Sequence, residues 1–304
     1  MIVAESLTKS FGGREAVSSL SFSTLKGEIF GIVGPDGAGK STLLRMAAAI
    51  LRPDSGNLSI DGMDVSGNPY SIKERLAYMP QRFGLYEDLT VEENIYFFGR
   101  LFGRSKRQIR AGLDRLYGFS RLGPFRDRLA GKLSGGMKQK LGLACCLVHA
   151  PDLILLDEPT NGVDPVSRRE FWKILYDLLS DGVTILVSTA YLDEAERCNR
   201  IALMYRGRFI TSGYPSDIKE SIGKRFMEMK TSNPIMSEME LRKKPEYKGI
   251  ILTGETLRLF VSDVEDSKRK IKKILTGAGI KTISMTEKTP TLEDCFVHIV
   301  AEEK

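Results

Sequence analysis

The stretch Gly34-Pro-Asp-Gly-Ala-Gly-Lys-Ser-Thr42 decides the fold of this chain of 304 residues. It matches the pattern GxxxxGK[ST] and lies between a short apolar run, Glu28–Val33, and a helical pattern over about Lys40–Ile50. Glycines let such a loop curl so that its backbone N–H groups point inward at phosphates. The positive end of the following helix dipole attracts the same anion. The stretch therefore predicts a phosphate-binding loop between a strand and a helix.

Two side chains of this loop are expected to carry chemistry of their own. Lys40 supplies a positive charge to the β and γ phosphates of a nucleotide, and Ser41 offers its hydroxyl to Mg²⁺. The other loop residues that we expect to contact the nucleotide are Gly34, Gly37, Gly39 and Thr42. The predicted ligand is therefore a nucleoside triphosphate with Mg²⁺.

A second apolar run, Leu153-Ile-Leu-Leu-Asp157-Glu158, ends in two acidic residues. Successive side chains of a strand point to opposite faces, so the two carboxylates need not share a role. Asp157 suits holding Mg²⁺ through water and Ser41, and Glu158 suits orienting an attacking water. Together with the phosphate loop, the pair predicts hydrolysis of the bound nucleotide.

The pattern on either side of these motifs predicts an α/β fold. Short apolar runs such as Leu153–Leu156 and Thr184–Val187 alternate with helical patterns, which indicates a mainly parallel sheet covered on both faces. Other stretches alternate like antiparallel strands: Ile2–Leu7, Val17–Phe22, Gly56–Ile60 and a pair over Ile201–Ile210. We therefore expect a P-loop NTPase core with an antiparallel β subdomain.

Residues 87–150 show helical patterns only and predict a helical subdomain inserted in this core. Thr90 followed by Glu93 predicts a capping box at its first helix. Further helices are expected over Ser105–Tyr117 and Gly135–Ala150.

The composition changes near Gly223, where we place the start of a second domain, residues 223–304, after a first domain of residues 1–222. The expected strands of the second domain are Phe226–Lys230, Gly249–Leu252, Leu257–Val261 and Ile280–Thr286, and the helices are Pro234–Arg242, Val264–Leu275 and Leu292–Val300. This βαββαβα order predicts a small α+β domain of the split βαβ, ferredoxin-like type.

The stretch Leu133-Ser-Gly-Gly-Met-Lys-Gln-Lys140 narrows the class of nucleotide-binding protein. It resembles the signature motif of ATP-binding cassette (ABC) proteins. The other motifs of that family occur in the family's order along about residues 1–222. The resemblance implies that Phe11 stacks on adenine and that Gln81, in YMPQ, is the Q-loop glutamine near the metal and the attacking water. It also implies a Walker B motif at Asp157-Glu-Pro-Thr160 and a D-loop that contains Asp164.

The signature implies a dimer. Ser134, Gly135 and Gly136 stand just before a helix and give a second anion-binding helix N-terminus. In the family, this signature closes over the γ phosphate that a second cassette binds, so two ATP molecules are held between two cassettes. ATP hydrolysis then opens the dimer and moves a bound membrane partner.

Family detail favours export. The stretches VGPDGAGK, YMPQRFGLYEDLT and LAGKLSGGMKQKLGLAC resemble cassettes of the bacterial multidrug exporter type, which serve ABC-2 permeases. The stretch Thr289-Pro-Thr-Leu-Glu-Asp294 is similar to the tails of those cassettes. The resemblance implies ATP and Mg²⁺ as cofactors, an integral-membrane permease of the ABC-2 type, and a second cassette that is identical or different.

Two positions depart from the family. Asp36 replaces an asparagine, and it either faces solvent or caps a turn, or it tunes nucleotide affinity. Ala190 replaces the histidine of an STH segment, and a methyl group cannot donate a hydrogen bond to the γ phosphate or orient water beside Glu158. Three explanations stay open: a weak site that Glu158 compensates, a site completed by a different partner cassette, or an engineered change. Nucleotide binding is expected in each case, with weak turnover.

Composition and charge narrow the alternatives. No apolar stretch approaches the roughly 20 residues that cross a bilayer, and the start MIVAESLTKSF lacks the pattern of a secretory leader. The 45 basic and 39 acidic residues leave a net charge of +6, which does not call for nucleic acid. We expect a cytoplasmic protein held at the inner face of the cell membrane by its permease. A soluble cassette acting on nucleic acid or ribosomes, and a weakly hydrolysing ATP sensor, are the alternatives.

Two surface features have two explanations each. Aromatic residues near the Q-loop either pack the helical subdomain or receive a permease helix: Phe83, Tyr86, Tyr96, Phe97 and Phe98. The basic stretch Arg100–Lys132 is either a solvated helical face or a surface that attracts anionic lipid.

The four cysteines form no CxxC pair, so we expect buried or incidental thiols.

Overall fold

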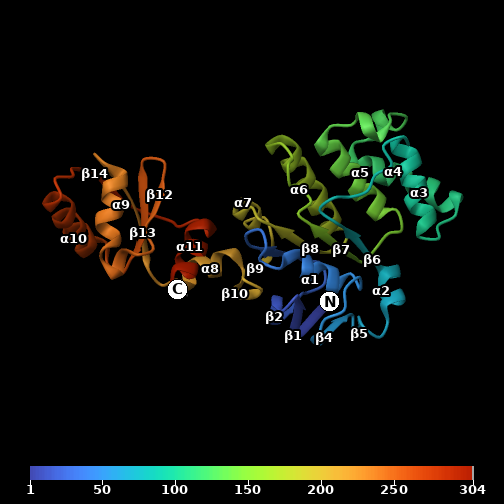
Figure 1. The fold of residues 1–304 in the computed structure, drawn as a ribbon. Coiled ribbons are helices and arrows are strands. Elements are labelled where there is room, and N and C mark those ends of the chain that lie inside the picture. The colour runs from blue at the N-terminus through green and yellow to red at the C-terminus, as the bar shows by residue number, and fades with distance from the viewer. Residues whose placement is uncertain (303–304) are drawn as a thin grey trace. The chain divides into compact units, whose positions relative to one another are not determined.

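The computed structural model describes residues 1–302, which form two compact units (Figure 1). The first unit comprises residues 1–191 and 198–209, and the second comprises residues 192–197 and 210–302. The chain therefore enters the second unit briefly, returns to the first, and leaves it again. The domain boundary expected at residues 222 and 223 stays a prediction; the division by contacts falls between residues 209 and 210.

A six-stranded sheet in the order β10-β9-β3-β8-β7-β6 organises the first unit, although the last residues of β10, 210–213, are counted with the second unit. Its strands are β3 (Ile29–Val33), β6 (Leu76–Met79), β7 (Leu153–Asp157), β8 (Thr184–Thr189), β9 (Arg200–Tyr205) and β10 (Arg208–Gly213). The pairs β3–β8, β3–β9, β6–β7 and β7–β8 are parallel. Every residue of β3, β7 and β8 is buried, which explains their continuous apolar runs. The predicted α/β fold is confirmed, and the carboxyl ends of β3, β7 and β8 meet at one edge of the sheet.

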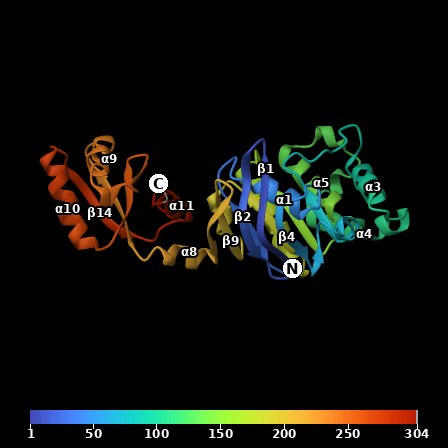
Figure 2. The same ribbon diagram turned by 60° about the horizontal axis from the view of Figure 1, so that its bottom comes forward.

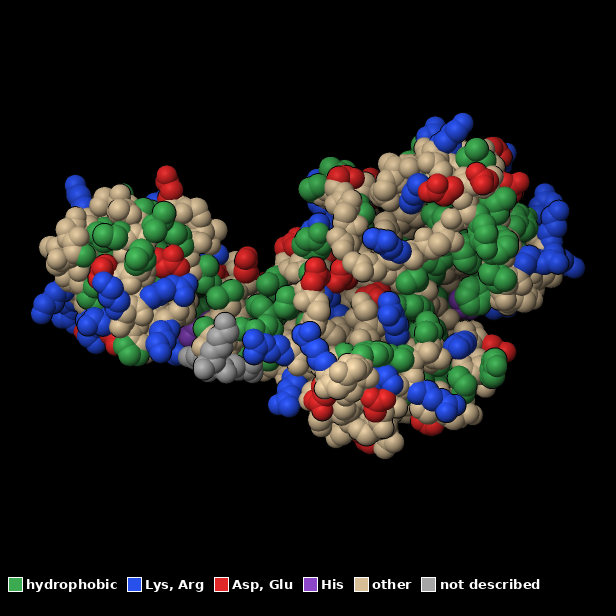
Figure 3. Space-filling view, in the orientation of Figure 1, with side chains coloured by type: hydrophobic (Ala, Val, Ile, Leu, Met, Phe, Trp, Pro, Cys, Tyr) green, Lys and Arg blue, Asp and Glu red, His purple; other side chains and the backbone are tan. Residues whose placement is uncertain are grey.

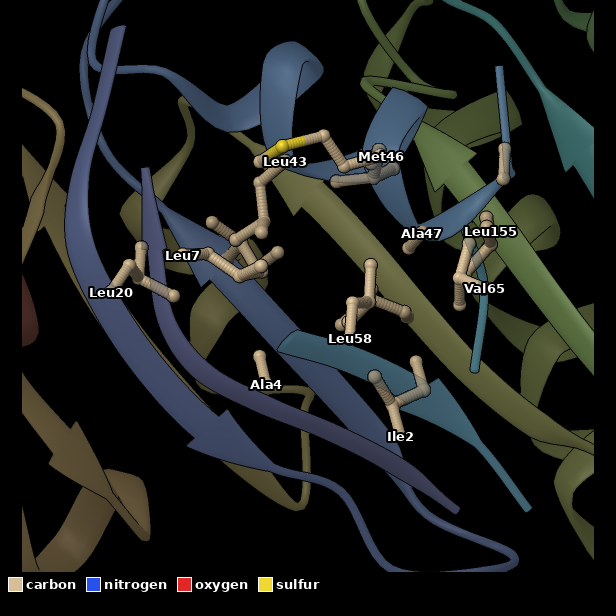
Figure 4. Close-up of a cluster of buried hydrophobic side chains, with 14 of the residues drawn as sticks. Ile2, Ala4, Leu7, Leu20, Leu43, Met46, Ala47, Leu58, Val65 and Leu155 are labelled. Atoms are coloured by element: carbon tan, nitrogen blue, oxygen red, sulfur yellow. The ribbon is translucent and has the colours of Figure 1, made fainter. Parts of the chain in front are cut away.

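An antiparallel sheet in the order β2-β1-β4-β5 forms the predicted β subdomain (Figure 2). Its strands are β1 (Ile2–Phe11), β2 (Arg14–Ser23), β4 (Ser55–Ile60) and β5 (Met63–Asp64). Leu7, Leu20 and Leu58 of this sheet share one buried cluster with Leu43 and Met46 of helix α1 (Lys40–Ala47) (Figure 4). Burying one such side chain fully stabilises the fold by ~2 kcal/mol. This cluster fixes α1, which carries the end of the phosphate loop.

Three helices lie within residues 87–150, the stretch in which we expect a helical subdomain. Its helices are α3 (Val91–Leu101), α4 (Lys106–Ser120) and α5 (Gly135–Leu147), with short 3₁₀ turns at Gly123–Phe125 and Ala130–Lys132. The predicted capping box is present: the Thr90 N–H donates to Glu93 (2.8 Å), and the Glu93 N–H donates to the Thr90 hydroxyl (3.2 Å). Within residues 1–302, no helix has the length and apolar character needed to cross a membrane.

Part of the strand pattern was not predicted. The antiparallel pair expected over Ile201–Ile210 is present, because β9 and β10 are neighbours in the sheet and are joined by the two-residue turn Arg206–Gly207. The parallel pairing of β9 with β3 was missed. Strands β5 and β6 and helix α2 (Pro69–Arg75) were not predicted. β6 reads LAYM, and four residues are too few to show a period. Helix α6 (Pro165–Ser180) connects β7 to β8.

The second unit contains the predicted ferredoxin-like arrangement. Strands β11 (Arg225–Thr231), β12 (Ile251–Thr253), β13 (Thr256–Val261) and β14 (Thr282–Lys288) form an antiparallel sheet in the order β12-β13-β11-β14. Its helices are α7 (Leu192–Ala195), α8 (Pro215–Ser221), α9 (Pro234–Arg242), α10 (Val264–Gly277) and α11 (Leu292–Glu302), with a 3₁₀ turn at Pro245–Tyr247. Met227 and Leu259 pack with α9 and α10, whereas Phe226 and Phe260 pack with Cys295 of α11. Alternation along β11 and β13 thus gives the sheet two covered faces.

Candidate nucleotide site

The phosphate loop between β3 and α1 has space only for glycine at two of its positions. A Cβ atom added to Gly34 would lie 2.1 Å from the carbonyl oxygen of Met204, and one added to Gly39 would lie 2.2 Å from that of Ala16. Gly39 also has a φ of 112° and Gly37 a φ of 76°, which side chains disfavour. The glycine spacing read from the sequence is therefore a requirement of close backbone packing.

The ammonium group of Lys40 is buried and fully partnered. It donates to the carbonyl oxygens of Gly34 (2.8 Å) and Pro35 (3.1 Å), and it lies 2.9 Å from Oε1 of Glu158. The Lys40 side chain is only 4% exposed, and a buried charge needs such partners because water cannot solvate it. Lys40 and Glu158, predicted to act on the same nucleotide, are thus brought together directly.

The carboxylate of Asp157 is held by three hydroxyl groups. Its Oδ1 accepts from Ser41 (2.9 Å) and Ser188 (2.7 Å), and its Oδ2 accepts from Tyr78 (3.4 Å). Burial raises the pKa of Tyr78, and the negative charge of Asp157 raises it further. Ser41 and Asp157 offer a hydroxyl and a carboxylate side by side, a set of hard oxygen donors that fits Mg²⁺.

The carboxylate of Glu158 is fixed from several sides. Besides Lys40, Gln81 donates to its Oε2 (3.0 Å) and Asn161 donates to the same oxygen (3.1 Å). Its backbone has a φ of 48°, which is strained for a residue with a side chain. The Glu158 N–H donates to Ser188, both to the hydroxyl (3.0 Å) and to the carbonyl oxygen (3.1 Å). These bonds hold the strained conformation in place.

A cleft of about 670 Å³ opens above the loop. Its lining includes Phe11, Arg14, Glu15, Asp36, Gly37, Gly39, Lys40, Ser41, Thr42, Gln81, Glu158 and Arg206. Phe11 ends β1 and is 52% exposed, so a base can reach its ring. Asp36 is exposed and also borders the cleft, so it faces both solvent and the place of the anion.

The signature residues lie elsewhere in the first unit. Ser134 caps α5 by accepting from the Met137 N–H (3.3 Å), and Asp164 caps α6 by accepting from the N–H groups of Val166 (3.0 Å) and Ser167 (2.9 Å). A Cβ on Gly136 would meet Ser167 at 2.5 Å, whereas one on Gly135 would meet no atom within 4 Å. Among the residues described, neither Asp164 nor the Ser134–Gly136 stretch lines the cleft above the phosphate loop. One chain therefore presents two separate groups of predicted site residues.

Comparison with known proteins decides the family. A family model described as "ABC transporter" matches residues 17–161. The Escherichia coli (strain K12) protein named "Probable multidrug ABC transporter ATP-binding protein YbhF" is 42% identical over 304 residues, 99% of this chain and 52% of that protein. The "Nod factor export ATP-binding protein I" of Rhizobium sp. (strain N33) is 37% identical, over 97% of this chain and 95% of that protein. The chain belongs to the ABC transporter family. It spans about half the length of the Escherichia coli relative.

Solved ABC structures support the same fold. An ATP-binding subunit of an ABC transporter matches with a TM-score of 0.66 and 28% identity, over 73% of this chain and 93% of that one. A dimeric bacterial ABC transporter cassette matches with a TM-score of 0.64 and 26% identity, over 70% of this chain and 98% of that one. The predicted fold class, an ABC cassette of the P-loop NTPase type, is therefore confirmed.

Ala190, the position where the family has a histidine, directly follows β8. Ala190 is half-buried, and the next residue, Tyr191, donates its N–H to the Thr189 hydroxyl (3.0 Å). The Arg168 guanidinium of α6 lies over the Tyr191 ring, 4.0 Å from its centroid. The segment is thus attached to the helix that follows the D-loop, although its alanine offers no side-chain hydrogen bond.

Several residues of the site were not predicted from the sequence. Ser188 and Tyr78 hold Asp157, and Arg14 and Arg206 add positive charge to the cleft. Ser188 could have been found, because it lies next to the last residue of β8, the parallel neighbour of β7. Arg206 follows β9, whose parallel pairing with β3 was missed.

Proposed function

We propose that this chain is an ATP-binding and ATP-hydrolysing subunit that powers an ABC exporter. One observation carries the proposal: Lys40, Asp157 and Glu158 meet at the carboxyl ends of parallel strands, beside a loop that admits only glycine at Gly34 and Gly39. This arrangement offers phosphates a cation, backbone N–H groups and an adjacent base, which are the groups that phosphoryl transfer to water requires.

Each residue of the cleft has a proposed task. The loop glycines, Lys40 and Thr42 bind the phosphates, and Phe11 stacks on adenine. Ser41, Asp157 and Gln81 would hold Mg²⁺, which neutralises charge on the phosphate oxygens when it is bound. The γ phosphate competes with Glu158 for Lys40, because both anions need the same ammonium group. Glu158, once released from Lys40, accepts a proton from the attacking water, which Gln81 helps to orient.

A second cassette is the proposed partner at the signature. Ser134, Gly135 and Gly136 stand at the N-terminus of α5, where backbone N–H groups and the helix dipole attract an anion. Ser134, Gly135 and Asp164 are exposed, so a second chain can reach them. We propose that these residues complete the ATP site of a partner cassette, identical or different. A solved relative is dimeric, which supports this proposal.

The other proposed partner is an integral-membrane permease of the ABC-2 type, with the chain cytoplasmic and peripheral at the inner face of the membrane. The printed names of the relatives include multidrug transport and Nod factor export. A cleft of about 1150 Å³ between α3 and α4 is lined by Tyr96, Phe97, Arg100 and Arg110, among others. Figure 3 shows hydrophobic side chains in this part of the surface, bordered by Lys and Arg. Such a surface suits an amphipathic helix of a permease.

Hydrolysis by the purified chain tests the proposal. Mg²⁺-dependent release of phosphate from ATP is expected to exceed that of the Lys40→Ala variant, which has lost the cation of the site. Binding of a fluorescent ATP analogue, measured in parallel, separates binding from turnover. Tight binding without turnover would instead support the regulatory ATP sensor that Ala190 keeps open. Salt-sensitive RNA binding would favour the nucleic-acid alternative.

A further inference from the structure

The chain leaves the nucleotide site through a segment that belongs to the second unit. Strand β8 ends with Ser188 and Thr189, and Ala190 and Tyr191 follow. The next residues, 192–197, include α7 and are part of the second unit, after which the chain returns to the first unit at Cys198. One residue, Tyr191, therefore separates the position of the missing histidine from an element of the second unit.

Helix α7 is held firmly inside that unit. Glu194 and Ala195 are completely buried, and α7 packs against α11 (Figure 1). Just after α7, Glu196 receives two hydrogen bonds from Lys219 of α8, at 3.1 Å and 3.0 Å. Helix α8 packs against α11 as well. These three elements form one cluster, so α7 cannot shift without α8 and α11.

Helix α11 is in turn fixed to the C-terminal sheet. Asp294 is buried, accepts from the N–H (2.8 Å) and the hydroxyl (2.6 Å) of Thr291, and pairs with Arg258 of β13 (3.0 Å). The Arg258 guanidinium lies over the Phe226 ring of β11, 5.2 Å from its centroid. Thr291 and Asp294 belong to the stretch Thr289–Asp294 that the sequence singled out. That stretch therefore joins the sheet to the cluster around α7.

At its other end the segment reaches the catalytic carboxylates through Ser188. The Ser188 hydroxyl donates to Asp157 (2.7 Å), and it accepts from the N–H of Glu158 (3.0 Å), whose φ is 48°. A strained conformation persists only where its surroundings hold it. A displacement of the end of β8 would therefore release Glu158 from the geometry that hydrolysis needs.

We propose that the second unit positions Glu158 for hydrolysis through α7 and Ser188, with Glu196 and Lys219 as positioning residues. The inference rests on the proposed ATPase function and assigns that site a control by the C-terminal unit. Because position 190 is an alanine, the segment 190–197 affects hydrolysis by positioning Ser188 and not by a side chain that contacts the nucleotide. A partner that moves α11 would change turnover by the same route.

Charge reversal in the full chain tests this inference. In Lys219→Glu and in Glu196→Lys, like charges face each other, and kcat for MgATP is expected to fall on the order of threefold to tenfold. KM and the affinity for a fluorescent ATP analogue should stay unchanged, because Lys40 and the loop are not altered. The double exchange, Lys219→Glu with Glu196→Lys, restores the attraction and is expected to restore kcat. Both side chains are partly exposed (24% and 38%), so folding should survive.

A matched pair in the same unit controls for general damage. Glu238 and Arg242 form an ion pair on α9 (2.8 Å), and exchanging their charges should leave kcat unchanged. Unchanged kcat in both single variants, or a double exchange that restores nothing, overturns the inference.

A chain without turnover above Lys40→Ala would contradict the proposed function, and a second measurement then decides the inference. Amide hydrogen exchange over residues 185–191 is expected to be faster in Lys219→Glu and to return to its original rate in the double exchange. Exchange that is the same in all variants overturns the inference independently of activity.

Discussion

The two groups of site residues in this ABC protein differ in how complete they are within one chain. Around the phosphate loop, Lys40, Asp157 and Glu158 are buried and bonded to one another or to neighbouring side chains. At the signature, Ser134 and Asp164 are exposed, and each accepts hydrogen bonds from the first turn of its own helix. Under the proposed function, the first group binds a nucleotide by itself, whereas the second contacts the nucleotide of another chain. Comparing the two groups therefore separates nucleotide binding, which we assign to the first group, from dimer closure, which we assign to the second.

The largest effect is expected when the proposed base, Glu158, is removed from the group of residues around the phosphate loop. Glu158→Gln keeps the shape of the side chain and its contacts with Gln81 and Asn161 but cannot accept a proton from water. Turnover should fall about 100- to 10,000-fold, as for loss of a general base. Phosphate release is the measurement. ATP binding should persist, and size-exclusion chromatography with ATP should show more dimer. A variant that retains turnover would show that Glu158 is not the base.

The next effect adds a donor at the end of β8. Ala190→His is expected to raise turnover about tenfold to a hundredfold, because a hydrogen bond to a charged group contributes about 1.5–3 kcal/mol. Steady-state kinetics measure the gain, and Ala190→Gln provides a control of similar size. A histidine that changes nothing would favour the explanation in which a different partner cassette completes the site.

Two glycine substitutions compare the groups directly. Gly39→Ala places a Cβ 2.2 Å from a carbonyl oxygen at a φ of 112°, so it should cost at least about 2 kcal/mol of stability and abolish ATP binding. Gly135→Ala enters open space and should change stability by less than about 0.5 kcal/mol. Its ATP binding should be normal, but its ATP-driven dimerisation should be weaker. Thermal unfolding, analogue binding and light scattering make the three measurements. Normal ATP-driven dimerisation of Gly135→Ala would contradict a role of the second group in dimer formation.

The smallest effect concerns acid stability at the second group. Hydrogen bonds from the Ser167 side chain and backbone hold the pKa of Asp164 below its ordinary value of 3.8. Because the folded pKa is the lower one, this contribution is complete above the unfolded value and is lost as pH falls through the folded value. As the pH is lowered from 5 through the folded pKa of Asp164, the urea midpoint of unfolding should therefore fall less in Asp164→Asn than in the unchanged protein. Asp88→Asn, at an exposed position, removes the same charge and should keep the full drop.

Much of the fold could be predicted because its signals are local. The buried strands β3, β7 and β8 read as apolar runs bounded by turns, and the order of elements after residue 223 predicted the ferredoxin-like sheet. β6 has only four residues. β9 pairs with β3, which lies far away in the sequence: Arg200 of β9 faces Phe30 of β3. Neither feature leaves a local pattern to read.

The site divides in the same way. Lys40, Ser41, Asp157 and Glu158 belong to contiguous motifs, so their types and spacing could be interpreted before their contacts were known. Ser188 and Tyr78 act only because β8 and β6 flank β7 in the sheet. The attachment of residues 192–197 to the second unit was also beyond reach, because it depends on packing between α7 and α11.

If Lys40 binds the γ phosphate and Glu158 is the base, as we propose, their ion pair makes one ammonium group serve substrate and base in turn. A ligand with a γ phosphate must outcompete an intramolecular carboxylate, so part of its binding free energy goes into freeing that carboxylate. ADP reaches the same lysine with fewer oxygens, and Glu158 can then reclaim its partner. Re-formation of the pair would thus favour release of the product, so the same salt bridge would link the state of the base to nucleotide exchange.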